Sequence, residues 1–214
     1  MRIYKLLSVL LCYPEHDLTD AVPELRHALA DQPQYLITLE PLLDELAAND
    51  LITLQQDYVQ TFDRTAAHSL HLFEHIHGED RARGQAMVDL LNEYQQHGFE
   101  SVSDELPDYV PLFLEFLSTC DVEVAAPLLG DAIHVLAHIG NKLNASGSNY
   151  GAVFEVLQDL SPVEAEPLTV PPIRDMDEAL ETFGPGVDGV EPLLKPVAPI
   201  NFYAKRPDVA PSVH

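Results

Sequence analysis

Residues 122–143, VEVAAPLLGDAIHVLAHIGNKL, decide the fold class, because their apolar side chains recur every three or four positions. The repeating positions are Ala125, Leu128, Leu129, Ala132, Ile133, Leu136 and Ala137. This spacing places them on one face of a helix. Pro127 lies near the start of the stretch and is a position at which the helix could kink. The stretch therefore predicts a long helix that buries one face against the rest of the protein.

Helical spacing continues on both sides of this stretch, through residues 1–160. The further segments that show it are residues 3–11, 20–30, 35–48, 51–63, 80–97, 112–117 and 148–157. No stretch alternates between apolar and polar residues as a half-buried strand would. We therefore predict an all-α fold, with one bundle-like domain of several helices over residues 1–160.

Several residues are placed to start or end these helices. Asp80 could cap a helix that Gly98 ends. Asp108 could cap the next helix, which would place Pro111 at the third helical position, where no intrahelical hydrogen bond is lost. Ser148 could cap the last helix.

The composition changes after residue 160. Ten of the 17 prolines and three of the 10 glycines lie in residues 161–214. Because such a composition cannot bury enough apolar surface to form a packed core, we expect a partly disordered, proline-rich tail. Within this tail, residues 175–183 are expected to form a short helix, and residues 195–203, KPVAPINFY, form a compact apolar segment.

The charge of the chain excludes two classes of partner. The 214 residues carry 35 acidic side chains against 11 basic ones, for a formal net charge of -24. Nucleic acids and anionic membranes both attract surfaces that are rich in Lys and Arg. We therefore expect no nucleic-acid binding. An acidic surface instead attracts cationic partners, such as a basic peptide.

The N-terminal sequence and the cysteines indicate a reducing, cytoplasmic location. Cys12 and Cys120 are the only cysteines, and they form no metal-binding or redox pattern. The first residues, MRIYKLLSVLLC, resemble a signal sequence in composition, but their apolar residues have helical spacing and no cleavage site follows. No apolar run approaches the ~18 residues of a membrane span. We therefore expect a cytoplasmic protein without stable membrane insertion.

Four histidines lie within ten residues, and His71 to His75 match the H-x-x-E-H pattern of inverted zincins. On a helix, His71 and His75 would lie one turn apart and could bind Zn²⁺, while Glu74 activated a bound water. His134 or His138 could supply a third ligand. Two other interpretations compete with this zinc hydrolase. The histidines could lie at the solvent edge of an amphipathic helix, or they could border a groove that receives a partner's helix or peptide.

The same cluster carries a resemblance to a known family. Residues 69–78, SLHLFEHIHG, continue through Arg81, Arg83, Gly84, Gln85, Ala86 and Met87, and this sequence closely resembles the signature of the respiratory nitrate reductase delta subunits. The stretches that also agree are residues 6–14, LLSVLLCYP; 58–63, YVQTFD; 105–112, ELPDYVPL, with 115–117, EFL; and 199–203, PINFY. The members of this family are molybdenum-cofactor assembly chaperones, a kind of redox enzyme maturation protein.

This resemblance implies an all-helical cytoplasmic chaperone that is not an enzyme and carries no cofactor. It implies binding to the N-terminal leader peptide of the apo catalytic (alpha) subunit of a nitrate reductase, in complex with the beta subunit. The chaperone would keep this client competent for molybdenum cofactor insertion, together with molybdenum-cofactor biosynthesis proteins, and would delay its docking to the membrane anchor. A chlorate, selenate or dimethyl sulfoxide reductase is an alternative client.

Together, the resemblance and the charge predict that the leader peptide lies in a groove between residues 71–77 and the helix that follows Asp108. The expected peptide-binding residues are His71, Phe73, Glu74, His75, His77, Arg81, Arg83, Asp63, Asp108, Tyr109 and Glu115. Apolar anchors would supply most of the affinity, and the carboxylates among these residues would meet the basic end of the peptide. Phe73 could instead belong to the core, and Asp108 could serve only as a helix cap.

Overall fold

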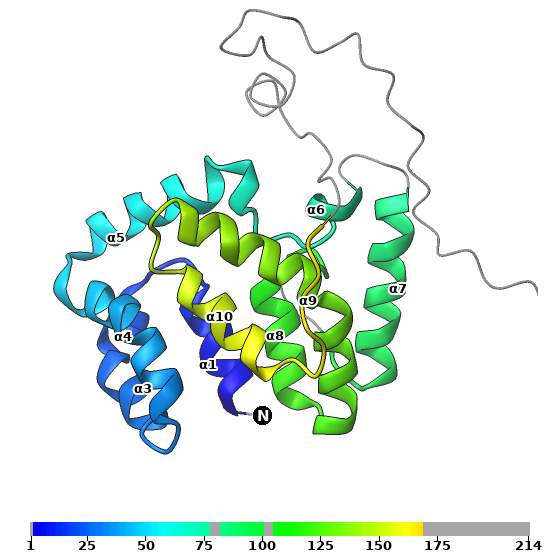
Figure 1. Cartoon of the computed structure of the whole chain (residues 1–214), viewed down its shortest axis with the longest axis horizontal. Coiled ribbons are helices and arrows are strands. Elements are labelled where there is room, and N and C mark those ends of the chain that lie inside the picture. The colour runs from blue at the N-terminus through cyan, green and yellow to red at the C-terminus, as the bar shows by residue number, and fades with distance from the viewer. Residues whose placement is uncertain (1, 78–81, 101–104, 169–214) are drawn as a thin grey trace, which may run out of the picture. The chain divides into compact units, whose positions relative to one another are not determined.

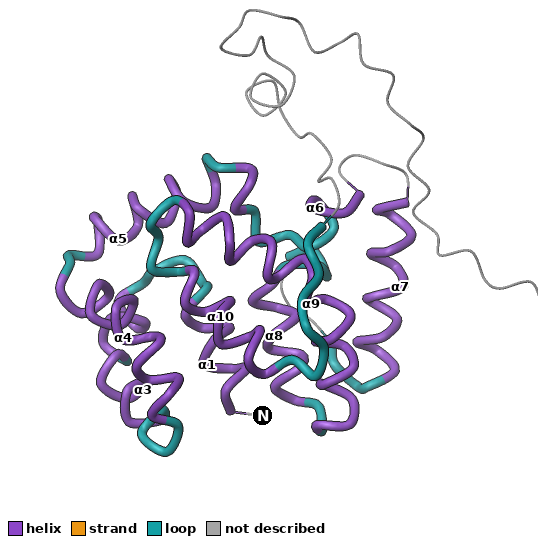
Figure 2. Tube along the Cα trace, viewed as in Figure 1, coloured by secondary structure: helices purple, strands orange, loops and turns teal. Residues whose placement is uncertain are grey.

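The computed structural model describes residues 2–77, 82–100 and 105–168, whose arrangement is shown in Figure 1. The α-helices in these ranges are α1 (Arg2–Leu10), α2 (His16–Asp20), α3 (Val22–Ala28), α4 (Pro33–Ala48), α5 (Leu51–Tyr58), α6 (Glu74–His77), α7 (Ala82–Gln96), α8 (Val110–Thr119), α9 (Val122–Ala145) and α10 (Gly151–Leu160). A π-helix (Val59–Asp63) and a 3-10 turn (Ala66–His68) follow α5. The described ranges contain no strand, as Figure 2 also shows, and the predicted all-α fold is confirmed.

The core is built around α9 and α10, which form a helical hairpin (Figure 1). Leu129, Ile133 and Leu136 on the predicted apolar face of α9 are completely buried. The two helices approach closely at Gly140, where an added Cβ atom would lie 2.5 Å from the Cβ atom of Phe154. By length and composition α9 could also cross a membrane. Its burial against α10 and α8 instead makes it the central helix of a globular core.

The first helix has the amphipathic character that its sequence predicts. Its buried apolar residues are Ile3, Tyr4, Leu6, Leu7 and Leu10. They pack along α8, which is apolar on most of its surface. The two helices are also joined by a hydrogen bond, because the Ser8 hydroxyl donates to the carbonyl oxygen of Pro111 at 2.7 Å. This pair of helices fixes the position of the segment that enters α8.

Helix capping differs from the prediction at two places. The residue that flanks the start of α8 is Tyr109, not Asp108, so Pro111 occupies the second helical position rather than the third. Asp108 cannot act as the cap because its carboxylate is turned inward and is completely buried. At α10, Ser148 makes no side-chain cap. Its backbone carbonyl instead accepts the N–H of Gly151 at 3.1 Å, which satisfies the start of the helix.

Two predicted helices are each divided in the structure. Residues 20–30 span the end of α2 and all of α3, and residues 51–63 form α5 followed by the π-helix. α9, in contrast, continues through Pro127. Gly98 ends α7 as predicted, with a φ of 73° that favours glycine. Asp80 and the tail segments predicted at 175–183 and 195–203 lie outside the described residues.

Residues 161–168, which we call the strap, pack back against α9 and are yellow in Figure 1. A Cβ atom at Gly130 would lie only 3.1 Å from a methyl carbon of Val163. Four residues further along α9, Nδ1 of His134 accepts the backbone N–H of Glu166 at 2.9 Å. The strap therefore follows one face of α9 and holds His134 by a backbone hydrogen bond.

Candidate functional site

A cavity of about 310 Å³ lies where four segments that are distant in the sequence meet. Its lining residues are Tyr13, Tyr58, Phe62, Asp63, Ser69, Leu70, His71, Glu105 and Tyr109. They come from the turn between α1 and α2, from the end of α5 with the π-helix, from the segment before α6, and from the segment before α8. Because four aromatic rings and His71 line it, we call it the aromatic cavity.

The π-helix places two residues of opposite character at this cavity. The backbone N–H of Arg64 bonds the carbonyl oxygen of Val59 at 3.0 Å, five residues earlier, which is the hydrogen bond that defines a π-helix. Within this turn, Phe62 is buried with its ring centroid 4.9 Å from that of Tyr150. The next residue, Asp63, is exposed at the cavity. Such single π-helical turns occur frequently at functional sites.

The tyrosines of the cavity form a connected group. The Tyr58 hydroxyl donates to the carbonyl oxygen of Leu11 at 2.9 Å and lies 3.4 Å from the Tyr109 hydroxyl. The ring of Tyr13 meets that of Tyr58 edge to face, with centroids 5.4 Å apart. Burial raises the pKa of Tyr109 to about 12 and that of Tyr58 further. Tyr58 and Tyr109 are therefore neutral at physiological pH and offer aromatic surface and hydroxyl groups rather than charge.

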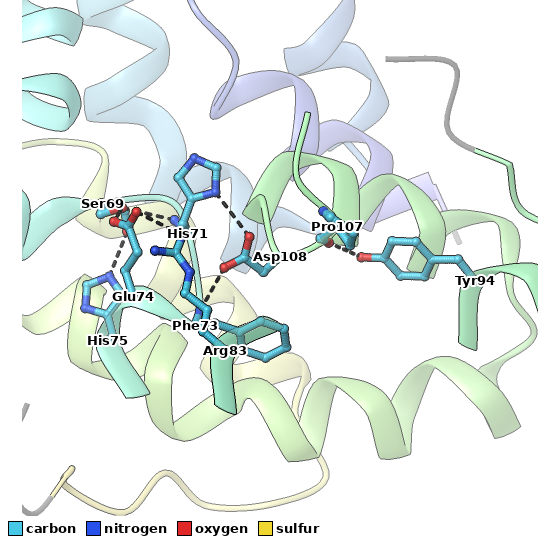
Figure 3. Close-up of polar contacts among 9 residues, drawn as sticks. All are labelled: Ser69, His71, Phe73, Glu74, His75, Arg83, Tyr94, Pro107 and Asp108. Carbon is cyan, nitrogen blue, oxygen red and sulfur yellow. Dashed lines mark hydrogen bonds and ion pairs between the residues drawn. The ribbon is translucent and has the colours of Figure 1, made fainter. Parts of the chain in front are cut away.

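His71 lies beside Tyr109 and is fixed by Asp108; Figure 3 shows the contact with Asp108. The carboxylate of Asp108 accepts from His71 Nδ1 at 3.2 Å and from the backbone N–H of Phe73 at 2.9 Å. The segments that carry these residues are themselves paired, because the N–H of Val110 donates to the carbonyl oxygen of Leu70 at 2.8 Å. Three long-range contacts, two to the Asp108 side chain and one between backbones, therefore hold this wall of the cavity in place.

The hydrogen bond to Asp108 also favours the protonated form of the His71 ring. It raises the pKa of His71, against the opposing effect of partial burial of the ring. Because Asp108 accepts at Nδ1, that nitrogen carries a proton in both the neutral and the charged ring. The ring stacks at a tilt on Tyr109, with centroids 5.4 Å apart. Titration of His71 therefore changes the charge at the cavity without releasing the Nδ1 contact.

A second polar network supports the same segment from behind (Figure 3). The Ser69 hydroxyl donates to Glu74 at 2.5 Å, and Arg83 on α7 donates to the other oxygen of Glu74 at 3.1 Å. The backbone N–H of His71 in turn donates to the Ser69 hydroxyl at 3.2 Å. Glu74 and Arg83 therefore hold the segment that lines the cavity and do not line it themselves.

The geometry does not fit the predicted zinc site. His71 precedes α6, so His71 and His75 do not lie one turn apart on a helix. His75 is buried, and its Nε2 lies 2.8 Å from the carbonyl oxygen of Ser69, a contact in which that nitrogen must be a donor. His134 accepts a hydrogen bond from the strap, and His138 lies against the ring of His75. In the part of the chain that the structure describes, no three His, Cys, Asp or Glu side chains are placed to hold a metal ion. The predicted zinc site at His71, Glu74 and His75 is therefore not formed by the described residues.

The residues predicted to bind the peptide divide into groups. Those that line the aromatic cavity are His71, Asp63 and Tyr109, and those that support it are Asp108, Glu74 and Arg83. Of the others, His75 is buried, the rings of Phe73 and His77 contact each other, and Glu115 pairs with Lys5. Arg81 lies outside the described residues. The structure thus places only part of the predicted set at one cavity.

Six residues of the cavity were not among the predicted set. They are Tyr13, Tyr58, Phe62, Ser69, Leu70 and Glu105. Each stands in one of the stretches by which the sequence resembles the nitrate reductase delta subunits: residues 6–14, 58–63, 69–78 and 105–112. The signal that could have found them was the joint occurrence of these stretches, because four separate matches suggest segments that meet in space.

Comparison with known proteins connects the fold and the cavity to one family. The family model described as nitrate reductase delta subunit matches residues 16–155. The chain is 39% identical over 160 residues to the nitrate reductase molybdenum cofactor assembly chaperone NarJ of Escherichia coli K12, covering 73% of this chain and 68% of that protein. It is 38% identical over 168 residues, 75% of this chain and 68% of that protein, to the probable chaperone NarW of the same strain. A probable NarJ of Bacillus subtilis is 28% identical over 156 residues, 72% of this chain and 85% of that protein.

A solved structure supports the fold independently. A putative redox enzyme maturation protein from Archaeoglobus fulgidus superposes with a TM-score of 0.56 at 20% identity, covering 74% of this chain and 92% of that chain. The three relatives described above are named as assembly chaperones, a non-catalytic class, so the chain is not an enzyme. From the match over residues 16–155 and the identity to NarJ, we conclude that the chain belongs to the nitrate reductase delta subunit family, the molybdenum cofactor assembly chaperones.

Proposed function

We propose that this protein is the assembly chaperone of a nitrate reductase and binds the N-terminal leader peptide of the apo catalytic subunit at the aromatic cavity. Binding keeps the client competent for molybdenum cofactor insertion and delays its docking to the membrane anchor. The observation that carries the proposal is the convergence of four family-like stretches on one cavity. Four segments that are distant in the sequence thus contribute exposed as well as buried residues to one partly open surface.

The chemistry of the surface suits a peptide that is both apolar and basic. The aromatic cavity shares Tyr13 with a second cavity of about 570 Å³, which is lined by Ile52, Gln55, Gln56, Asp57, Val59, Gln60 and Arg64. Ile52 is 67% exposed there and offers an apolar contact. The two adjoining cavities extend the binding surface along α5, as a helix or extended peptide would need. The net charge of -24 favours the approach of a basic segment.

The wider setting of this function follows from the same family. We place the chaperone in the cytoplasm, acting on the catalytic subunit in complex with the beta subunit and together with molybdenum-cofactor biosynthesis proteins. The names of the relatives support nitrate reductase as the client class. Chlorate, selenate and dimethyl sulfoxide reductases are the alternative clients, and their leader peptides can be compared with that of nitrate reductase in one competition experiment.

Calorimetric titration of the full-length chain with a synthetic leader peptide of the nitrate reductase catalytic subunit tests the proposal. Tyr13→Ala should weaken binding by about tenfold or more, because Tyr13 lines both cavities and aromatic anchors dominate such interfaces. Ile37→Ala is the matched control: Ile37 is 73% exposed on α4 and lines neither cavity. Equal affinity of the two variants, or no binding by the unaltered chain, would refute the assignment.

A further inference from the structure

The aromatic cavity combines aromatic walls with carboxylates that lack a cation. We infer that it is the receptor for a single arginine side chain of the client's leader peptide. This inference rests on the proposed function and deepens it, because it names the chemical group that the cavity recognises. The remaining, apolar part of the peptide would lie against the adjoining cavity along α5.

The first argument is the balance of charge at the cavity. Asp63 and Glu105 line it from different segments, and both are exposed. No lysine or arginine is among the described residues that line it, and the positive charge that His71 can carry there is paired with Asp108. Within residues 2–77, 82–100 and 105–168, neither carboxylate takes part in an ion pair or a hydrogen bond, unlike Glu74 with Arg83 or Glu115 with Lys5. These two carboxylates are therefore available to a cation from another molecule.

The second argument is that the negative charges of Asp63 and Glu105 both reach the ring of Tyr109. All three residues line the same cavity, and the negative charges of Asp63 and Glu105 each help to raise the pKa of Tyr109. A cation that lies on the Tyr109 ring would thus be within the field of Asp63 and Glu105 together. Such a cation would be attracted by the faces of the neutral tyrosine rings as well as by the two carboxylates.

The third argument concerns the shape of the cation. The cavity is lined by the rings of Tyr13, Tyr58 and Tyr109 and by the carboxylates of Asp63 and Glu105, which come from different segments. A guanidinium group is planar, stacks on aromatic faces and donates hydrogen bonds along several edges, whereas an ammonium group is a compact, strongly hydrated charge. A volume of about 310 Å³ also admits the whole end of an arginine side chain. The geometry therefore favours arginine over lysine.

The experiment uses the full-length chain and the synthetic leader peptide of the catalytic subunit. In a set of peptides, each arginine in turn is replaced by citrulline, which keeps the shape and removes the charge, or by lysine. We expect one position at which citrulline weakens binding by about tenfold or more and lysine weakens it by less than citrulline but measurably. The other positions should change the dissociation constant by less than about threefold, as exposed charges do.

The double variant Asp63→Asn, Glu105→Gln then assigns that arginine to the cavity. Both side chains are exposed, so the variant should fold normally, with an unchanged melting temperature. It should bind the parent peptide about tenfold more weakly and should no longer distinguish the parent from the critical citrulline peptide. Glu24→Gln with Asp31→Asn is the matched control, because it removes the same charge from exposed positions outside the cavity.

The outcomes separate this inference from the proposed function. If the unaltered chain does not bind the leader peptide at all, both fail. If it binds and Tyr13→Ala weakens binding, but no citrulline replacement matters, the function stands and the arginine receptor is wrong. The receptor is also wrong if the critical citrulline costs as much in the Asp63, Glu105 variant as in the unaltered chain, because the arginine would then bind elsewhere.

Discussion

Replacing Asp108 with asparagine tests how the wall of the aromatic cavity is held. Asp108 is completely buried, and its carboxylate accepts from His71 Nδ1 at 3.2 Å and from the Phe73 N–H at 2.9 Å. Asparagine has nearly the same shape but only one acceptor oxygen. It can serve one of these two donors and presents its own N–H₂ group to the other.

The size of the effect follows from the charge of the lost partner. A hydrogen bond to a charged group contributes about 1.5–3 kcal/mol, whereas a neutral one contributes about 1 kcal/mol. At pH 6, a protonated His71 meets the Asp108 carboxylate, so Asp108→Asn should lower the free energy of unfolding by about 2–3 kcal/mol. As the pH rises and the ring loses its charge, the pair is no longer an ion pair, but the acceptor is still a charged carboxylate, so the cost should fall toward about 1.5 kcal/mol.

The direction of this pH dependence is set by the pKa of His71. The bond to Asp108 raises that pKa above its ordinary value of about 6.5. When the pKa of a histidine is higher in the folded than in the unfolded state, its protonation stabilises the fold. This stability is fully present at pH values below the pKa of the unfolded state and is lost as the pH rises through the pKa of the folded state. The difference between the two proteins should therefore shrink between neutral and alkaline pH, and the pKa of His71 in the variant should be lower than in the parent.

Urea unfolding of both full-length proteins at pH 6 and pH 9, with an NMR titration of His71, measures these quantities. Tyr94→Phe is the control, because it removes the nearby bond from the Tyr94 hydroxyl to the Pro107 carbonyl at 2.6 Å (Figure 3). Burial raises the pKa of Tyr94, which stays neutral at pH 9, so this cost of about 1 kcal/mol should not depend on pH. An equal cost of Asp108→Asn at both pH values would refute the reasoning.

Three further substitutions have distinct expected effects, each measured by urea unfolding of the full chain. Gly140→Ala should lower the free energy of unfolding by about 1–2 kcal/mol, because the new Cβ atom would lie 2.5 Å from the Cβ atom of buried Phe154. The higher helix preference of alanine offsets only part of the cost of this overpacking. The free energy of unfolding of Gly130→Ala should stay within about 1 kcal/mol of that of the parent, because the nearest neighbour is the Val163 side chain of the strap, which can move. A larger loss of stability would mean that the strap is rigid. Lys5→Ala should cost less than about 1 kcal/mol, because both members of its pair with Glu115 are well exposed, and a larger cost would show that this pair joins α1 to α8.

Helical periodicity predicted most of the fold because it reports the burial of one face, which is the main source of helix stability in a folded chain. It succeeded for α1 and α9, whose apolar faces lie against α8 and α10. It failed to predict the π-helix after Tyr58. That turn brings Phe62 against Tyr150, and a contact between residues so distant in sequence leaves no local pattern.

The cap assigned to Asp108 was wrong for a related reason. An aspartate before an apolar run usually serves the first free N–H groups of a helix. Here two donors from a distant segment, at His71 and Phe73, take the carboxylate, and the segments pair through the bridge between His71 and Tyr109. Competition from tertiary contacts decides the role of such a residue, and the sequence shows only the local candidate.

The histidine-rich signature illustrates how the polar residues of a motif can build a site without forming its contact surface. Glu74 bonds Ser69, and His75 bonds the carbonyl oxygen of the same Ser69, so two side chains of the motif secure one residue at the cavity. His71 is secured separately by Asp108. Because these bonds fix an extended segment rather than one face of a helix, the H-x-x-E-H spacing predicted a metal site that the described residues do not form. Asp63 and Glu105, on the neighbouring segments, are exposed at the same cavity and take part in no ion pair among the described residues.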